Sequence, residues 1–124
     1  MNRAMEAARA SIADFVARLE HPPKTQTRVL LKVRVQEGDV VEHLWLENIR
    51  RSGEDFSGEI GNEPLSLVSV KLGDRIEVPL ERVSDWAVVD AGRLVGGTTL
   101  RLLRARASPS ERAAMDEEQG FIVD

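Results

Sequence analysis

The sequence predicts an α+β fold, with an N-terminal helix, a small curled antiparallel sheet of about five strands of the SH3-like type, and two short C-terminal helices. Apolar residues recur at spacings of three and four over the first twenty residues, which is the period of an amphipathic helix. From Thr27 onward they alternate with polar residues, which is the period of a strand with one buried face. Strands and helices occupy separate parts of the chain, so α+β is favoured over a parallel βαβ sheet.

The first segment is expected to form one helix that ends before His21-Pro22-Pro23. Proline lacks the N–H donor, and the residue before it avoids helical backbone angles, so the helix should end there. We therefore predict a helix and proline hinge over residues 1–23 and a single α+β domain over 24–124. The helix either docks on that domain, which we favour, or forms a homodimer contact. Its predicted apolar residues are Met5, Ala8, Ile12, Phe15, Val16 and Leu19.

Five strands are predicted in the middle of the chain, at residues 27–35, 40–49, 56–60, 75–78 and 83–89. Strict alternation in the second strand places His43, Trp45 and Ile49 on one face. Leu44 and Leu46 then fall on the other face. Residues 65–72 fit either one or two helical turns or an irregular edge.

Two helices are expected after the strands. Gly96-Gly97-Thr98 is typical of a helix start, with Thr98 able to cap the helix. Ser108 and Pro109 suit the N-cap and the first position of the last helix, which should end at Gly120.

Composition excludes several classes of function. The 124 residues contain no cysteine, which removes disulfides, zinc ribbons, iron–sulfur clusters and thiol catalysis. The net charge of −4 and the absence of tyrosine disfavour nucleic-acid binding. No apolar run approaches the roughly 20 residues of a membrane span, and the start lacks a signal-peptide core. We therefore expect a cytoplasmic protein without a nucleic-acid or membrane partner.

His43 is the strongest candidate for chemistry, because a histidine near Glu42 or Asp85 can act as a general base. Neighbouring strand residues point to opposite faces, so Glu42 is poorly placed to orient His43. We favour a histidine packed beside Trp45. With His21 and His43 as the only histidines, in different elements, no metal or cofactor is expected.

Two other features are candidate binding sites. The backbone N–H groups of Gly96, Gly97 and Thr98 could hold an anion, although no phosphate-loop lysine follows and capping is the simpler interpretation. A second candidate is a surface for an extended peptide. It would consist of His43, Trp45, Asp85 and Trp86.

The chain resembles the YegJ-like family of uncharacterised bacterial proteins, the domain of unknown function 2314, from Val41 to about Met115. The matching segments are Glu42-His43-Leu44-Trp45-Leu46, Phe56 to Pro64, Gly73 to Ile76, Asp85-Trp86, Gly96 to Arg104 and Ser108 to Arg112. Thr98 stands where the family carries an aromatic residue before a threonine, so the resemblance leaves open whether Thr98 or Thr99 caps the helix. The resemblance implies a small bacterial α+β domain and supplies no activity or catalytic residue.

We expect a non-enzymatic module that binds a protein or peptide, because no adequate catalytic constellation accompanies the sheet and its two tryptophans. The alternative is a small hydrolase-like or transferase-like enzyme that uses His43 with Asp85 or Glu42.

Overall fold

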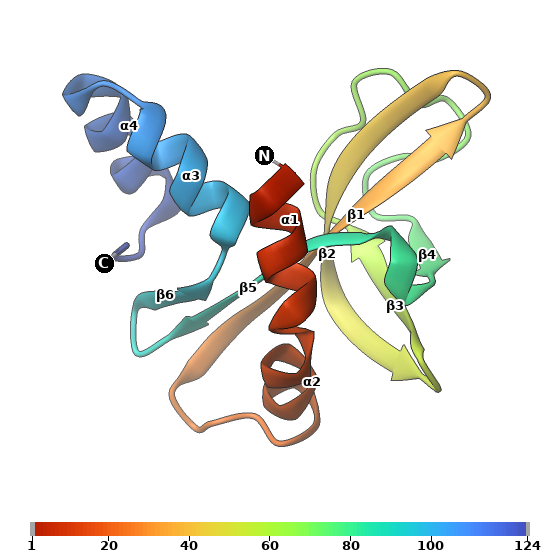
Figure 1. Ribbon diagram of the computed structural model, residues 1–124, viewed down its shortest axis with the longest axis horizontal. Coiled ribbons are helices and arrows are strands. Elements are labelled where there is room, and N and C mark those ends of the chain that lie inside the picture. Colours follow the sequence, from red (N-terminus) through yellow and green to blue (C-terminus); the bar gives the residue numbers. More distant parts are fainter. Residues whose placement is uncertain (1, 124) are drawn as a thin grey trace. The chain divides into compact units, whose positions relative to one another are not determined.

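The computed structural model describes residues 2–123. In its first helix, the side chains of Asn2, Ala4, Met5 and Arg9 lie outside the description, and these include the predicted apolar position Met5. The fold is α+β, with helices at both ends of the chain and strands between them (Figure 1). The elements are α1 (Asn2–Ala10), α2 (Ile12–Glu20), β1 (Gln26–Glu37), β2 (Val40–Ser52), β3 (Asp55–Ile60), β4 (Arg75–Val78), the 3₁₀ turn η1 (Leu80–Arg82), β5 (Val83–Asp90), β6 (Arg93–Gly96), α3 (Thr98–Arg106) and α4 (Pro109–Gln119).

The described strands form a six-stranded open sheet in the order β4-β3-β2-β1-β5-β6. The prediction of about five strands was therefore wrong by one, and the SH3-like arrangement is not confirmed. The additional strand is β6, which pairs with β5 from Ala87↔Gly96 to Asp90↔Arg93. It has four residues between a turn and a helix start, too few to show an alternating pattern.

Contacts divide the chain into two compact units: residues up to Arg28 together with those from Asp85 onward, and residues 29–84. In the first unit, the predicted N-terminal helix is two helices that meet at Ser11. The Ser11 side chain donates to the Ala8 carbonyl at 3.0 Å, a local bond that competes with helix continuation. The second helix ends at His21, as the prolines predict.

The last helix follows its sequence signals closely. Ser108 caps α4 in a reciprocal capping box with Glu111, Pro109 is its first residue, and Gly120 ends it in the left-handed region. Arg104 of α3 binds Asp116 of α4 with two bonds of 3.0 and 2.8 Å, which fastens the two helices together.

In the second unit, β1 and β2 form a hairpin whose register runs from Leu31↔Leu46 to Glu37↔Val40. The turn residue Gly38 has φ of 57°, a conformation that glycine adopts without strain. The buried face of the hairpin consists of fully buried aliphatic side chains: Leu31, Val33, Leu44 and Leu46.

The prediction for Ile49 was wrong, because strand β2 does not alternate to its end. Asn48 has φ of 50°, and the pairing of β2 with β3 shifts between Glu47 and Arg50. This bulge turns Ile49 to the same face as Leu46. A Cβ on Gly58 would meet Ile49 Cδ1 at 2.8 Å and Leu46 Cβ at 2.9 Å, so only glycine fits beneath these two side chains.

Candidate functional site

The carboxylate of Asp85 holds the start of helix α3 within the first unit. Its oxygens accept from the backbone N–H groups of Thr98 at 3.2 Å and Thr99 at 2.9 Å, and from the Thr99 hydroxyl at 2.6 Å. The expectation that Thr98 caps the helix was wrong, because the N-cap is Gly97, in the left-handed region, and no N-cap side chain bonds the helix. Of the predicted anion position at Gly96, Gly97 and Thr98, the Thr98 N–H therefore binds an internal carboxylate, and the Gly97 N–H donates to the Trp86 carbonyl at 2.7 Å.

Trp86 belongs to the interior of the same unit. It is 3% exposed, its indole N–H donates to Ser11 Oγ at 2.9 Å, and its ring lies 5.7 Å from that of Phe15. Gly96 lies directly on the indole, since a Cβ there would stand 2.6 Å from two ring carbons. Asp85 and Trp86 are therefore interior residues with structural contacts, and neither offers a side chain to a partner on the folded surface.

His43 and Trp45 lie on β2 in the second unit, where both are half-buried. His43 Nδ1 lies 3.0 Å from Ser84 Oγ, and Ser84 donates to the Lys32 carbonyl at 3.3 Å. Burial, followed by the charges of Lys32 and Arg34, lowers the pKa of His43, so its ring is neutral at pH 7. His43 Nδ1 and Ser84 Oγ therefore share a hydrogen bond whose direction follows the tautomer of the neutral ring.

Ser84 is 2% exposed, so its hydroxyl is not open to a substrate as the hydroxyl of a serine nucleophile would be. Trp45 instead lies beneath the Lys32 ammonium, 5.7 Å from its ring centroid. The cluster therefore joins β2 to its neighbours through packing and hydrogen bonds.

Glu42 and Glu37 of the hairpin hold segment 65–72, which is irregular and has no helical turn, so of its two interpretations the irregular one is correct. Glu42 accepts from the N–H groups of Leu65, Ser66 and Leu67 at 2.8, 2.9 and 3.3 Å. Glu37 accepts from the N–H groups of Val68 and Ser69, both at 3.1 Å, and from the Ser69 hydroxyl. Five consecutive backbone donors are thus fixed by two carboxylates, so Glu42 is committed to the loop and does not serve His43.

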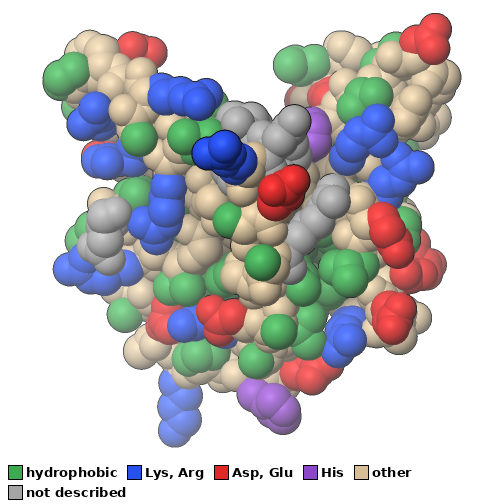
Figure 2. Space-filling model, viewed as in Figure 1, with side chains coloured by type: hydrophobic (Ala, Val, Ile, Leu, Met, Phe, Trp, Pro, Cys, Tyr) green, Lys and Arg blue, Asp and Glu red, His purple; other side chains and the backbone are tan. Residues whose placement is uncertain are grey.

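The apolar side chains of this segment point into solvent, and we call residues 65–72 the exposed loop. Leu65 is 91% and Val68 92% exposed, while Leu72 is 53% exposed. Only Leu67, at 6%, is buried and anchors the loop to the unit. Hydrophobic side chains are visible at the surface in Figure 2, beside Lys and Arg side chains.

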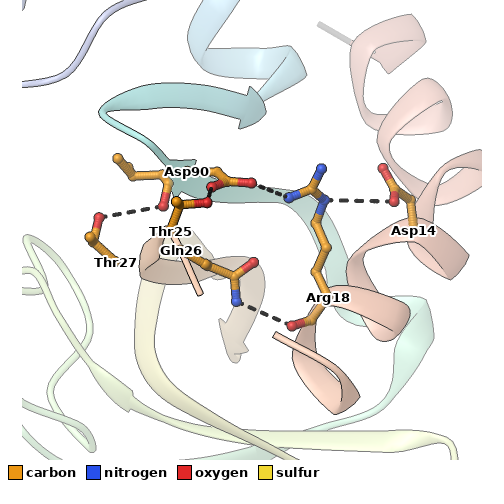
Figure 3. Close-up of polar contacts among 7 residues, drawn as sticks. Asp14, Arg18, Thr25, Gln26, Thr27 and Asp90 are labelled. Carbon is orange, nitrogen blue, oxygen red and sulfur yellow. Dashed lines mark hydrogen bonds and ion pairs between the residues drawn. The ribbon is translucent and has the colours of Figure 1, made fainter. Parts of the chain in front are cut away.

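A second polar cluster lies in the first unit, around Asp90 at the end of β5 (Figure 3). Its carboxylate accepts from the Thr25 hydroxyl and from Arg18 Nη1 at 3.1 Å, and both bonds, the Thr25 bond first, lower the pKa of Asp90. Arg18 Nε also lies 3.7 Å from Asp14, and the Arg18 carbonyl accepts from Gln26 at 3.1 Å. These contacts fasten α2 and the segment after it to β5.

Within residues 2–123, no group of three His, Asp or Glu side chains is close enough together to hold a metal ion. The helices in the described part of the chain lack the length and apolar character that crossing a bilayer requires.

Comparison with known proteins identifies the family. Residues 1–122 match the family model described as "Uncharacterized protein conserved in bacteria (DUF2314)". The chain belongs to this family. The YegJ-like resemblance in the sequence is thereby confirmed, and the match extends beyond Val41–Met115 to almost the whole chain.

Two relatives are similar to this chain over different shares of their own length. The "Uncharacterized protein YegJ" of Escherichia coli is 27% identical over 99% of this chain and 77% of its own length. The "Putative ankyrin repeat protein" of Neisseria meningitidis is 33% identical over 69% of this chain but only 34% of its own length, so this chain spans about a third of that relative. No solved structure matches the chain.

The four residues of the predicted interaction surface thus divide into two pairs in different units, His43 with Trp45 and Asp85 with Trp86. Sequence reasoning missed the hydrogen bonds that Ser84 makes with His43 and that Glu37 makes with the exposed loop, because these partners are distant in sequence. It also left the exposed loop undecided. No local signal decided its form, because residues 65–72 fit one or two helical turns as well as an irregular edge.

Proposed function

We propose that this chain is a non-enzymatic interaction module that binds a partner protein through the exposed loop. One observation carries the proposal: a loop whose backbone is fixed at five donors holds Leu65 and Val68 almost fully in solvent. Burying one such side chain against a partner is worth about 1.5–3 kcal/mol. Since the loop is already ordered, little conformational entropy opposes binding.

Two further points support an interaction function. The candidate base His43 is hydrogen-bonded to a buried serine, and the candidate acids Glu42 and Asp85 each accept from backbone N–H groups. In the Neisseria relative, the segment that matches this chain belongs to a longer protein named for ankyrin repeats. Repeats of this kind build extended binding surfaces.

Site-specific photo-crosslinking in living bacteria tests the proposal. A photoreactive residue at Val68 is expected to give a discrete crosslinked protein that mass spectrometry identifies. The same residue at Leu103, which is 46% exposed on α3, is the matched control and should not give that product. In the chain carrying the residue at Val68, Leu65→Asp should abolish the product.

The absence of any crosslink at Val68, or the same product from both positions, would contradict a partner at the exposed loop. Circular dichroism of each variant verifies that the fold is intact before the comparison is made.

A further inference from the structure

A cavity of about 270 Å³ lies within the second unit. Its wall includes three consecutive residues of β1, Arg34 to Gln36, and three consecutive residues of β4, Ile76 to Val78. Consecutive side chains of a strand point to opposite faces of the sheet. A cavity that touches three consecutive residues of β4 therefore lies beside the edge of that strand.

The edge of β4 is open, because β4 is the last strand in the sheet order. Ile60 directs both backbone groups toward the chain that enters β4, since its N–H donates to the Asp74 carbonyl at 2.8 Å and its carbonyl accepts from the Gly73 N–H at 2.9 Å. This direction alternates along a strand, so Gly58 and Phe56 also face β4, and their partners Ile76 and Val78 direct their backbone groups toward β3. Glu77, between them, directs its N–H and C=O away from β3, where a further strand could pair with them.

The chemistry of the wall selects the occupant. Val35, Val70, Ile76, Val78 and Pro79 give the cavity an aliphatic lining. Its charged residues are two arginines, Arg34 and Arg82, and one acid, Glu77. Arg34 donates to Gln36 at 3.1 Å, and within residues 2–123 no carboxylate forms an ion pair with either guanidinium. Two arginines without an ion pair, beside an apolar lining, favour a ligand that has carboxylates next to aliphatic side chains.

We infer that this cavity is a binding site for an extended acidic peptide with aliphatic side chains, which adds as a strand to the open edge of β4. The Glu77 backbone supplies the strand hydrogen bonds, the aliphatic lining takes the aliphatic side chains, and Arg34 and Arg82 bind the carboxylates. Strand addition of this kind combines main-chain hydrogen bonds for affinity with pockets for specificity. The site shares Val70 with the exposed loop but does not use Leu65 or Val68, so it goes beyond the proposed function.

Binding of a fluorescent peptide, measured by anisotropy with the full chain, tests the inference. The probe is a seven-residue peptide of alternating valine and glutamate, and its counterpart carries lysine in place of every glutamate. The glutamate peptide should bind saturably and the lysine peptide at least about tenfold more weakly, because like charges would face the two arginines. Failure of the glutamate peptide to bind, or equal binding of the two, overturns the inference.

Variants separate the edge from the charges. Glu77→Pro removes the N–H that points away from β3 and breaks no bond to β3, so it should weaken peptide binding about fivefold. Glu77→Ala keeps that N–H and should bind the peptide at least as well as the unmodified chain does. Arg82→Glu should weaken binding about tenfold, while Arg106→Glu, on α3 and outside the cavity, should leave it unchanged. Full binding by Glu77→Pro would exclude strand addition, and full binding by Arg82→Glu would exclude the carboxylate contact.

A variant of the exposed loop distinguishes this inference from the proposed function. A chain with Leu65→Asp and Val68→Asp should bind the glutamate peptide normally, even if it has lost its crosslinked partner. Loss of peptide binding in that folded variant would contradict an independent site at β4.

Discussion

Asp85 is a fully buried carboxylate that accepts four hydrogen bonds, from the N–H groups of Trp86, Thr98 and Thr99 and from the Thr99 hydroxyl. A buried charge is tolerated when its lone pairs are satisfied and a helix N-terminus faces it. The Asp-Trp pair therefore has a structural explanation. Its carboxylate fixes α3, and its indole binds Ser11 and packs on Gly96.

Thr98 and Thr99 provide a matched test of this cap. Thr99→Val keeps the side-chain shape but removes a hydrogen bond to a charged acceptor, which should reduce the free energy of unfolding by about 1.5–3 kcal/mol. Thr98→Val removes no such bond and should change it by less than about 0.5 kcal/mol. Urea denaturation followed by circular dichroism measures both. Equal losses would mean that the Asp85–Thr99 bond is not what holds the helix.

Elements with local signals were predictable from the sequence. The β1–β2 hairpin follows from alternation around Glu37-Gly38-Asp39, and α4 follows from Ser108, Pro109 and Gly120. Features that depend on distant residues were not. The break at Ser11 coincides with a bond to Trp86, 75 positions away, and the bulge at Asn48 is visible only in the register with β3.

The candidate site shows the same division. Sequence reasoning selected Glu42, His43, Asp85 and Trp86 as chemically notable, and all four make specific contacts in the structure. It could not show that Asp85 and Trp86 are interior, or that Glu42 bonds the exposed loop 23 to 25 residues away. Burial and long-range pairing are set by tertiary contacts, which a local period does not encode.

The exposed loop should respond to pH through Glu42 and Glu37. Bonds from Leu65 and then Ser66 lower the pKa of Glu42, and bonds from Ser69 and then Val68 lower the pKa of Glu37. A glutamate in the unfolded chain has a pKa of about 4.3. The stabilisation of the loop is therefore complete above that pH and is lost as pH falls through the lowered pKa values of the folded state.

Amide chemical shifts from nuclear magnetic resonance measure this directly. The N–H signals of Leu65 and Ser66 should titrate with a midpoint below about 4.3. In Glu42→Gln their titration should vanish, while Val68 and Ser69 continue to titrate with Glu37. A midpoint at or above the unfolded value would contradict the carboxylate clamp.

The division into two units raises the question of whether they unfold separately. The chain passes from one unit to the other inside two strands, after Arg28 within β1 and after Ser84 within β5. Because each of these strands belongs to both units, the unfolding of one unit should also break strand hydrogen bonds of the other. Single domains of fewer than about 150 residues also usually unfold in one step. We therefore expect one cooperative transition.

The two tryptophans are suitable reporters, because Trp45 lies in residues 29–84 and Trp86 in the other unit. Their indole N–H signals should disappear with the same urea midpoint in the unmodified chain. A destabilising change confined to one unit, Phe15→Ala beside Trp86, should lower both midpoints together, because removing a buried phenylalanine costs about 3–5 kcal/mol of folding free energy. If only the Trp86 signal moved, the units would unfold independently, and the shared strands would not couple them.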